Sequence, residues 1–445
     1  MDRKAAQQWL ADGRLVRCVV DAILRRCARR RLVELDCQAA ARCQARVLRG
    51  LVHQARNTRF GRDHDFTRIR TPADFRRLVP LRTAARFWRD YGQPYFPQLE
   101  GVAWPEPASY LVPADEPPSP ALPFVPLSAS LLRSHRLAAL TALAMVLGGR
   151  PRARLFSGRI LFVGGTPAPA ASQVVAWSPD HATTRCGHDP VGSVAEAVLA
   201  ELPALLRPYF AWTTVPDGGA DFADERCRFR VEECIRLPVT GLVGPAGRLR
   251  RFLEGIRQRT ECDRITDIWP GLTAVLYGHD PASEDRARLM DLIGSASVVC
   301  LGMWFRPEGM LAVEDPRYGL LRLLVDHGLY YEFVPADTLD AAKPTRVGVG
   351  EVETGVPYAV ALSSPAGLWA CLLGSMVRFE RRQPPLFCLE EVPAPREEPA
   401  PEGTQARTDA PAVSLSAPHP RSGDIPAGPP GTPFHTPWSA RADRG

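Results

Sequence analysis

The alternation of apolar runs with amphipathic stretches over residues 159–364 constrains the fold more than any other feature of this chain of 445 residues. Runs with the length and apolar character of buried strands cover residues 159–165, 271–278, 296–304, 329–336 and 357–364. Stretches with apolar side chains at helical spacing cover residues 192–210, 246–260 and 283–294. Strands that alternate with helices predict a mostly parallel sheet with helices on its faces, so we expect an α/β fold.

The residues before this alternation predict helices. Residues 35–58 have apolar side chains at helical spacing, and residues 128–147 predict a second long helix with Ser128 as its N-cap. Pro72 suits the first position of a short helix, where the missing amide proton costs no hydrogen bond. We expect a basic helical segment at 1–35 that precedes a large domain.

The composition changes after that domain, which we expect to span residues 36–390. The last 55 residues contain 12 prolines and few large apolar side chains. Such a segment buries too little apolar surface to offset the entropy lost on folding. We therefore expect residues 391–445 to form a disordered tail.

Positive charge is concentrated near the N-terminus. Residues 1–60 carry 14 Lys and Arg against 5 Asp and Glu, while the whole chain has a net charge of +6. This is consistent with a surface for nucleic acid or an anionic membrane, and equally with a solvated arginine-rich helix face. The solvated face is favoured, because Lys4 and Lys343 are the only lysines and arginine is used throughout. We expect no nucleic-acid partner.

The cysteines and the apolar runs predict a cytoplasmic protein. The eleven cysteines are scattered and form no C-x-x-C, which is typical of reduced thiols. The longest apolar helix candidate begins at Leu137 and is too short to span a bilayer. We therefore expect no membrane span.

Two short motifs favour plain loops over binding sites. His181, Cys186 and His188 lie close together, but a metal site needs three or four convergent ligands and no partner cluster is evident. Residues 162–167 follow a strand, yet Pro167 stands where a helix N-terminus would be needed to bind phosphate.

A stronger candidate site lies at residues 300–309, where a buried strand ends. Trp304, Arg306 and Glu308 place an aromatic ring, a cation and a carboxylate at that end. The carboxyl ends of strands form the binding crevices of open α/β sheets. The alternative, weighted equally, is a capped strand with Arg306 and Glu308 solvated.

Residues 367–379 form a second candidate. They predict two short strands separated by Gly374 and Ser375. This stretch offers a ligand only the hydroxyl of Ser375 and no carboxylate.

Several stretches together resemble the Gretchen Hagen family of auxin-responsive acyl-acid amido synthetases. Residues 51–81 contain a helix, then T-x-[FY]-G-x-x-H-x-F, then a short helix that ends in V-P, similar to the family's N-terminal signature. The matching residues are Thr58, Phe60, Gly61, His64, Phe66, Val79 and Pro80. Residues 268–278, 329–336 and 356–379 are similar to later family motifs, so the resemblance covers about residues 35–390.

The resemblance implies the fold of adenylate-forming enzymes, with a large α/β domain and a small mobile C-terminal domain. It also implies a chemistry in which ATP and Mg²⁺ activate a carboxylic acid as an acyl-adenylate, which an amino acid then attacks to form an amide. Here the chain passes from residue 390 into the Pro-rich tail. We therefore expect the small C-terminal domain to be missing.

The family's phosphate loop, S-G-T-[ST]-G, corresponds to residues 114–128. Phosphate binding needs converging backbone amides and small residues. This stretch has no glycine and four prolines before its exit, and Asp115 with Glu116 would repel a triphosphate.

The resemblance also assigns roles to the first candidate site. Trp304 stands where the family tyrosine lies against adenine, and Glu308 is retained where the family holds nucleotide or Mg²⁺. Arg306 replaces a small residue and pairs with a phosphate or fills the pocket. If Glu308 is only a relic of a nucleotide site, its replacement should change stability as little as at an exposed polar position.

At the second candidate site the resemblance implies a loss of ligands. Ser375 replaces an aspartate whose carboxylate binds both ribose hydroxyls, a contact worth roughly 1.5–3 kcal/mol per bond. Ala370 and Leu372 replace two arginines. We expect ATP and Mg²⁺ to bind weakly or not at all.

The sequence thus predicts a degenerate member of the family, with weak or no catalysis and a small carboxylic acid as its possible ligand. The alternatives are an active but diverged acid–amino acid ligase and a subunit that needs a partner for activity.

Overall fold

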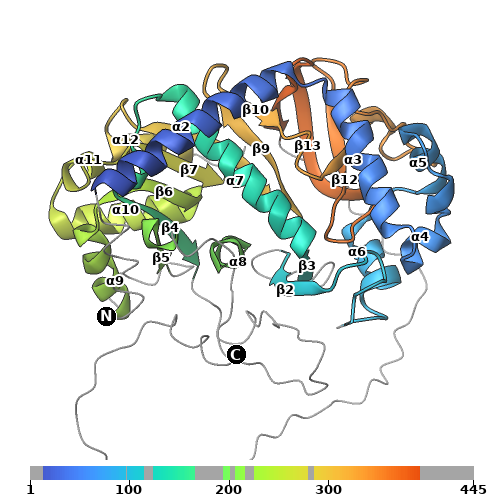
Figure 1. The fold of residues 1–445 in the computed structure, drawn as a ribbon, viewed down its shortest axis with the longest axis horizontal. Coiled ribbons are helices and arrows are strands. Elements are labelled where there is room, and N and C mark those ends of the chain that lie inside the picture. The colour runs from blue at the N-terminus through green and yellow to red at the C-terminus, as the bar shows by residue number, and fades with distance from the viewer. Residues whose placement is uncertain are drawn as a thin grey trace, which may run out of the picture. The chain divides into compact units, whose positions relative to one another are not determined.

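Twelve of the described strands form one large mixed sheet in the computed structural model (Figure 1). Its order is β11-β12-β13-β14-β10-β9-β8-β7-β6-β4-β5, and β1 pairs with β13. The strands of this sheet are β1 Arg82–Thr83, β4 Arg159–Gly165, β5 Phe210–Val215, β6 Val239–Pro245, β7 Ala274–Gly278, β8 Val299–Arg306, β9 Gly309–Asp315, β10 Leu320–Leu323, β11 Tyr330–Pro335, β12 Pro357–Ser363, β13 Cys371–Arg381 and β14 Leu386–Glu390. A separate two-stranded sheet consists of β2 Ala108–Pro113 and β3 Phe124–Ser128.

The structure describes residues 14–96, 98–114, 124–165, 194–200, 206–215, 225–278 and 285–390. Three sequence predictions lie outside these residues. They are the Pro-rich tail at 391–445, the cluster of His181, Cys186 and His188, and the part of the phosphate-loop stretch at 115–123.

The sheet is parallel mainly in one half, so the prediction of a mostly parallel sheet is wrong; in the other half only the short β1 pairs in parallel, with β13, among the described strands. Strands β5, β4, β6, β7 and β8 are parallel neighbours. From β8 through β9, β10, β14, β13 and β12 to β11, every pair is antiparallel. The reason is the length of the connections: Arg306 pairs with Gly309 across a tight turn, and a parallel pair would need a much longer crossover.

The described α-helices match most of the predicted ones. They are α2 Arg14–Cys37, α3 Ala40–Ala55, α4 Arg59–Asp63, α5 Pro72–Leu78, α6 Ala84–Phe87, α7 Ala129–Gly149, α8 Val194–Ala200, α9 Glu225–Arg236, α10 Ala246–Thr260, α11 Ile265–Ile268 and α12 Asp285–Ile293. The predicted cap of α7 is confirmed, because Ser128 Oγ accepts a hydrogen bond of 3.1 Å from the amide of Leu131. Pro72 opens α5 as expected.

The stretch at 367–379 differs from its prediction. Instead of two short strands, β13 runs continuously from Cys371 to Arg381. Its pairing with β12 shifts by a bulge between Ala359 and Ala361, and Gly374 adopts a φ of 67° there. Gly374, which the sequence analysis interpreted as a break between two strands, lies in this bulge, because glycine adopts a positive φ at little cost.

Helices cover both faces of the sheet. In β7, Val275 and Tyr277 belong to the apolar cluster that α10 and α12 complete. The alternate residues Ala274 and Leu276 belong to a different cluster, to which α2 and α7 contribute. Because successive side chains of a strand point to opposite faces, these two helix pairs lie on opposite sides of the sheet.

The residues of the 51–81 motif form a core around Trp369, which is fully buried. The ring centroid of Trp369 lies 5.9 Å from that of Phe60 and 4.7 Å from that of Phe66. Its Nε1 donates a hydrogen bond of 3.0 Å to the carbonyl of Ala103. A side chain at Gly61 would meet the carbonyl oxygen of Ala55 at 2.2 Å. The residues of the motif therefore have a packing role. They hold Phe60 and Phe66 against Trp369, in the turn before β13.

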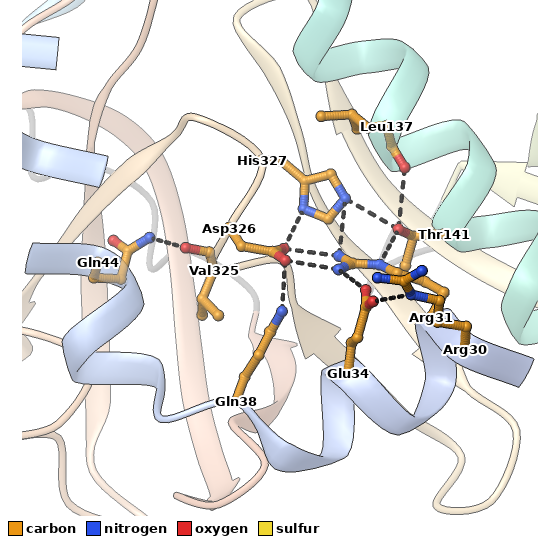
Figure 2. Close-up of polar contacts among 10 residues, drawn as sticks. All are labelled: Arg30, Arg31, Glu34, Gln38, Gln44, Leu137, Thr141, Val325, Asp326 and His327. Carbon is orange, nitrogen blue, oxygen red and sulfur yellow. Dashed lines mark hydrogen bonds and ion pairs between the residues drawn. The ribbon is translucent and has the colours of Figure 1, made fainter. Parts of the chain in front are cut away.

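A buried polar cluster joins α2 and α7 to the segment before β11, as Figure 2 shows. Arg31 of α2 donates two hydrogen bonds of 2.7 Å to the carboxylate of Asp326 and one of 3.1 Å to Thr141 Oγ1 on α7. His327 Nδ1 lies 3.0 Å from the same carboxylate. Burial by itself raises the pKa of Asp326, but the bonds from Arg31 and His327 outweigh it and hold this pKa well below its usual range.

Gln44 of α3 makes a second polar connection to the same segment. Its Nε2 donates to the carbonyls of Val325 and Leu329 at 2.8 and 2.9 Å, and its Oε1 accepts from the amide of Tyr331 at 2.8 Å. The side chain is 3% exposed. Gln44 thus completes three backbone groups that no water reaches.

Replacement of Gln44 by alanine should lower the free energy of unfolding by about 3 kcal/mol, because three buried backbone groups lose their partner at about 1 kcal/mol each. Urea denaturation of the wild-type and variant chains measures this change. The exposed Gln93 provides a control, and Gln93→Ala should change stability by under about 0.5 kcal/mol. Equal effects of the two substitutions would contradict the assignment.

Candidate functional site

Three of the four predicted site residues lie at the end of β8 and in the turn that leads to β9. Trp304 is 5% exposed and belongs to the main apolar core. Its ring meets Phe387 edge-on, with centroids 5.7 Å apart and an interplanar angle of 71°. Because so little of the ring is exposed, no face of Trp304 is open for a base to stack on.

Arg306 and Glu308 form an ion pair across this turn. Arg306 Nε lies 3.4 Å from Glu308 Oε2, and Glu308 is 2% exposed while the Arg306 side chain is 27% exposed. The alternative in which both charges are solvated is therefore wrong for Glu308. A carboxylate buried to this degree needs a partner, and Arg306 provides one.

His135 of α7 holds the same turn, a role that sequence reasoning missed. Its Nε2 donates a hydrogen bond of 3.2 Å to the carbonyl of Pro307, and its ring lies 5.4 Å from that of Phe305. Burial lowers the pKa of His135 to about 4, although the bond to Pro307 opposes the shift. His135 is therefore neutral at pH 7. The only signal in the sequence is one histidine in α7, between Ser134 and Arg136.

Ser375, the fourth predicted residue, lies on β13 and is half-buried. Cys371, the first residue of β13, lies near the β8–β9 turn. Burial, and then the nearby charge of Glu308, raise the pKa of Cys371 to about 12. No hydrogen bond joins Ser375 to Trp304 or Glu308 in the described part of the chain. Leu372, also half-buried, and the fully buried Ala370 give this strand end no further charge.

An apolar pocket lies beside the N-terminus of α7. It has a volume of about 40 Å³ and is lined mainly by side chains such as Phe87, Trp104 and Leu368. Glu106 lines the same pocket and occupies the start of α7, where Ser130 donates to its carboxylate from the backbone amide at 2.9 Å and from Oγ at 2.6 Å. The positive end of the helix thus already binds an anion of the protein itself.

These residues do not fit a nucleotide. Ribose binding requires a bidentate acceptor, and a single serine hydroxyl supplies none. Phosphate is bound by converging backbone amides or by a cation. Here the amide of Ser130 at the start of α7 is bonded to Glu106, and the charge of Arg306 is offset by Glu308. Across the described ranges, no three His, Cys, Asp or Glu side chains gather as a set of metal ligands.

Two separate parts of the chain match models of one family. Residues 29–87 match the GH3 family N-terminal domain, and residues 322–389 match the GH3 family central domain. The family resemblance read from the sequence motifs is thereby confirmed. No curated protein matches the chain.

Solved structures of adenylate-forming ligases share the fold. The structure of AtGH3.15 acyl acid amido synthetase in complex with 2,4-DB is 13% identical, with a TM-score of 0.59, and the match covers 81% of this chain and 70% of that one. An open conformation of 2-hydroxyisobutyryl-CoA ligase, in complex with 2-HIB-AMP and CoA, is 12% identical, with a TM-score of 0.53 and coverage of 78% and 68%. At these identities the likeness shows the fold alone.

The sequence led us to expect that replacement of Glu308 would hardly change stability. Because Glu308 is buried and paired, we now expect a measurable loss. Replacement of Glu308 by alanine should lower the free energy of unfolding by about 2 kcal/mol, since it removes one partner of a buried ion pair. The chain offers a matched control in Glu380, whose Oε1 also lies 3.4 Å from the Nε of an arginine two residues before it, Arg378. Both side chains of that pair are more than 40% exposed.

Glu380→Ala should therefore change stability by under about 1 kcal/mol, as exposed pairs do. Guanidinium denaturation of both variants beside the wild-type chain measures the two effects. If Glu308→Ala were as mild as Glu380→Ala, Glu308 would have no structural role.

His135 should make the fold sensitive to acid. Its pKa falls from 6.5 to about 4 on folding, so the unfolded chain takes up a proton that the folded chain resists. Stability from this group is complete above pH 6.5 and is lost progressively down to about pH 4. The loss amounts to about 3 kcal/mol.

Denaturation of the wild-type chain and of His135→Gln across this pH range measures the effect. The variant retains an amide that can donate to Pro307, yet this amide does not titrate. Between pH 6.5 and about pH 4 the variant should therefore lose about 3 kcal/mol less stability than the wild-type chain loses. His53→Gln, at an exposed position, should follow the wild-type curve. Parallel curves for all three chains would contradict the role of His135.

Proposed function

We propose that this chain, which carries the N-terminal and central domains of the GH3 family, is a degenerate acyl-acid amido synthetase with weak or no adenylating activity. The observation that carries the proposal is the buried ion pair of Arg306 and Glu308. At the end of β8 the carboxylate of Glu308 and the guanidinium of Arg306 offset one another.

The strand end at β13 supports the same conclusion. Ser375, Leu372 and Ala370 stand where the resemblance implies an aspartate and two arginines. Each of those family residues is charged, and each of the replacements is neutral. The replacements preserve packing, since Ala370 is fully buried, but they provide no charge-assisted contact to a nucleotide.

The ligand that we propose to remain is a small carboxylic acid. The apolar pocket near α7 is lined mostly by aromatic and aliphatic groups, which suits the body of such a molecule. Its volume of about 40 Å³ leaves little room, so the acid would have to be small or displace a lining side chain.

A thermal-shift measurement with Mg-ATP tests the proposal. A site that binds Mg-ATP with a dissociation constant of about 10 μM would gain about 2.7 kcal/mol at about 1 mM ligand, and the melting temperature would rise by several degrees. Loss of three charge-assisted contacts weakens binding by roughly a thousandfold. The stabilisation then falls below about 0.1 kcal/mol, so we expect no measurable shift.

Exchange of pyrophosphate into ATP, with a panel of carboxylic acids, measures adenylation directly. We expect no exchange above the blank with any acid. Exchange that depends on one acid, together with a rise of the melting temperature in Mg-ATP, would establish the chain as an active, diverged ligase. Exchange only after addition of a second protein would establish a partner-dependent subunit. Either result overturns the proposal.

A further inference from the structure

The outer face of α2 carries apolar and cationic side chains in one stripe. Val19, Ile23, Arg26, Arg30 and Val33 follow one another at spacings of four, three, four and three, so they share one side of the helix. The three apolar members are 56%, 58% and 63% exposed, and the Arg30 side chain is 83% exposed. This stripe is solvent-facing although more than half of it is apolar.

The opposite side of α2 is fully engaged within the fold. Ala28 and Leu35 are at most 4% exposed and pack in clusters that α7 completes. The core thus accounts for one face of the helix and leaves the outer stripe without a structural role.

The neighbouring helix α7 repeats the arrangement. Leu137 and Leu140 are 45% and 54% exposed, and Arg133, one turn before Leu137, is exposed as well. The pair of helices is joined directly by Arg31 of α2 and Thr141 of α7, and Figure 1 shows them crossing on one face of the sheet. The carbonyl of Leu137 accepts a hydrogen bond of 3.0 Å from Thr141 Oγ1, so the exposed residues of α7 begin next to this crossing.

The charge of this two-helix face is positive. Arg26, Arg29, Arg30 and Arg133 are exposed. Of the acidic residues of α2, Asp21 is 3% exposed and Asp36 is paired with Arg317 and Arg322. Glu34 offsets Arg30 at 2.9 Å, as Figure 2 shows, so Arg26, Arg29 and Arg133 carry the excess positive charge. An occupant of the face must accept both positive charge and apolar side chains.

We propose that the outer face of α2 and α7 binds the surface of an anionic phospholipid bilayer. The exposed Val19, Ile23, Leu137 and Leu140 enter the boundary between headgroups and acyl chains, and the arginines contact lipid phosphates and carboxylates. Protruding apolar side chains that no groove surrounds suit a fluid surface, which adapts to their shape. Nucleic acid would use the arginines but gain nothing from the apolar residues.

The contact is peripheral, because α7 is a core helix. Among the described residues α7 alone is long and apolar enough to cross a membrane, and 61% of its apolar window is buried inside the fold. This inference goes beyond the proposed function and does not depend on whether the chain binds ATP.

Co-sedimentation of the full chain with lipid vesicles tests the inference. We expect binding to vesicles rich in phosphatidylserine at low salt, and little binding to pure phosphatidylcholine or at high salt. Each arginine near an anionic surface strengthens binding about fivefold, so Arg26→Gln/Arg29→Gln should weaken it roughly 20-fold. The exposed pair Arg70→Gln/Arg89→Gln, on other elements, is the matched control and should bind as the wild-type chain does.

Insertion is tested separately by Ile23→Trp, whose fluorescence should shift to the blue in phosphatidylserine vesicles and not in buffer. Val19→Ser/Ile23→Ser should bind more weakly while its melting temperature stays unchanged. The proposal is overturned if the wild-type chain does not sediment with anionic vesicles, or if both arginine double variants lose binding equally. It is also overturned if the new tryptophan reports no insertion, or if the face instead retains an acidic protein or DNA and no vesicles.

Discussion

The placement of the N-terminal helices on the sheet depends on buried polar groups that must find partners. Arg31 and Gln44 lie almost 300 residues before the segment 325–331 that they bind. In a low-dielectric interior an unpaired guanidinium or carbonyl is costly, so these bonds accept only one arrangement of α2 and α3. That arrangement in turn positions α7 and brings the 51–81 motif against Trp369.

The same requirement shapes the candidate site, with the opposite consequence for function. In the cluster around Asp326 the pairing of charges joins elements of the fold. At the β8–β9 turn Arg306 and Glu308 pair with one another, and our proposal that the chain adenylates weakly or not at all depends on this pair. Arg306 and Glu308, which the sequence suggested as ligand-binding residues, thus have a structural role. The outer face of α2 shows the converse, since exposed charges and apolar groups there have no structural role.

Sequence periodicity predicted the elements well and their pairing less well. The bounds of β4 and α10 agree with the runs 159–165 and 246–260, and the cap at Ser128 is present. Periodicity reports which face of an element is buried but not which strand lies beside it. The antiparallel half of the sheet follows from short connections such as the turn at Pro307, and the sequence does not show that these connections reverse the chain.

The sequence by itself determined most elements of this protein, the kind of fold that they build and the neutral character of Ala370, Leu372 and Ser375. These are properties of residue type and local spacing. Only the tertiary structure decided that Glu308 is buried against Arg306, that His135 holds the same turn, and that α2 contacts α7 through Arg31. Burial and pairing depend on contacts between distant parts of the chain, and these exist only once the sheet and its helices have assembled.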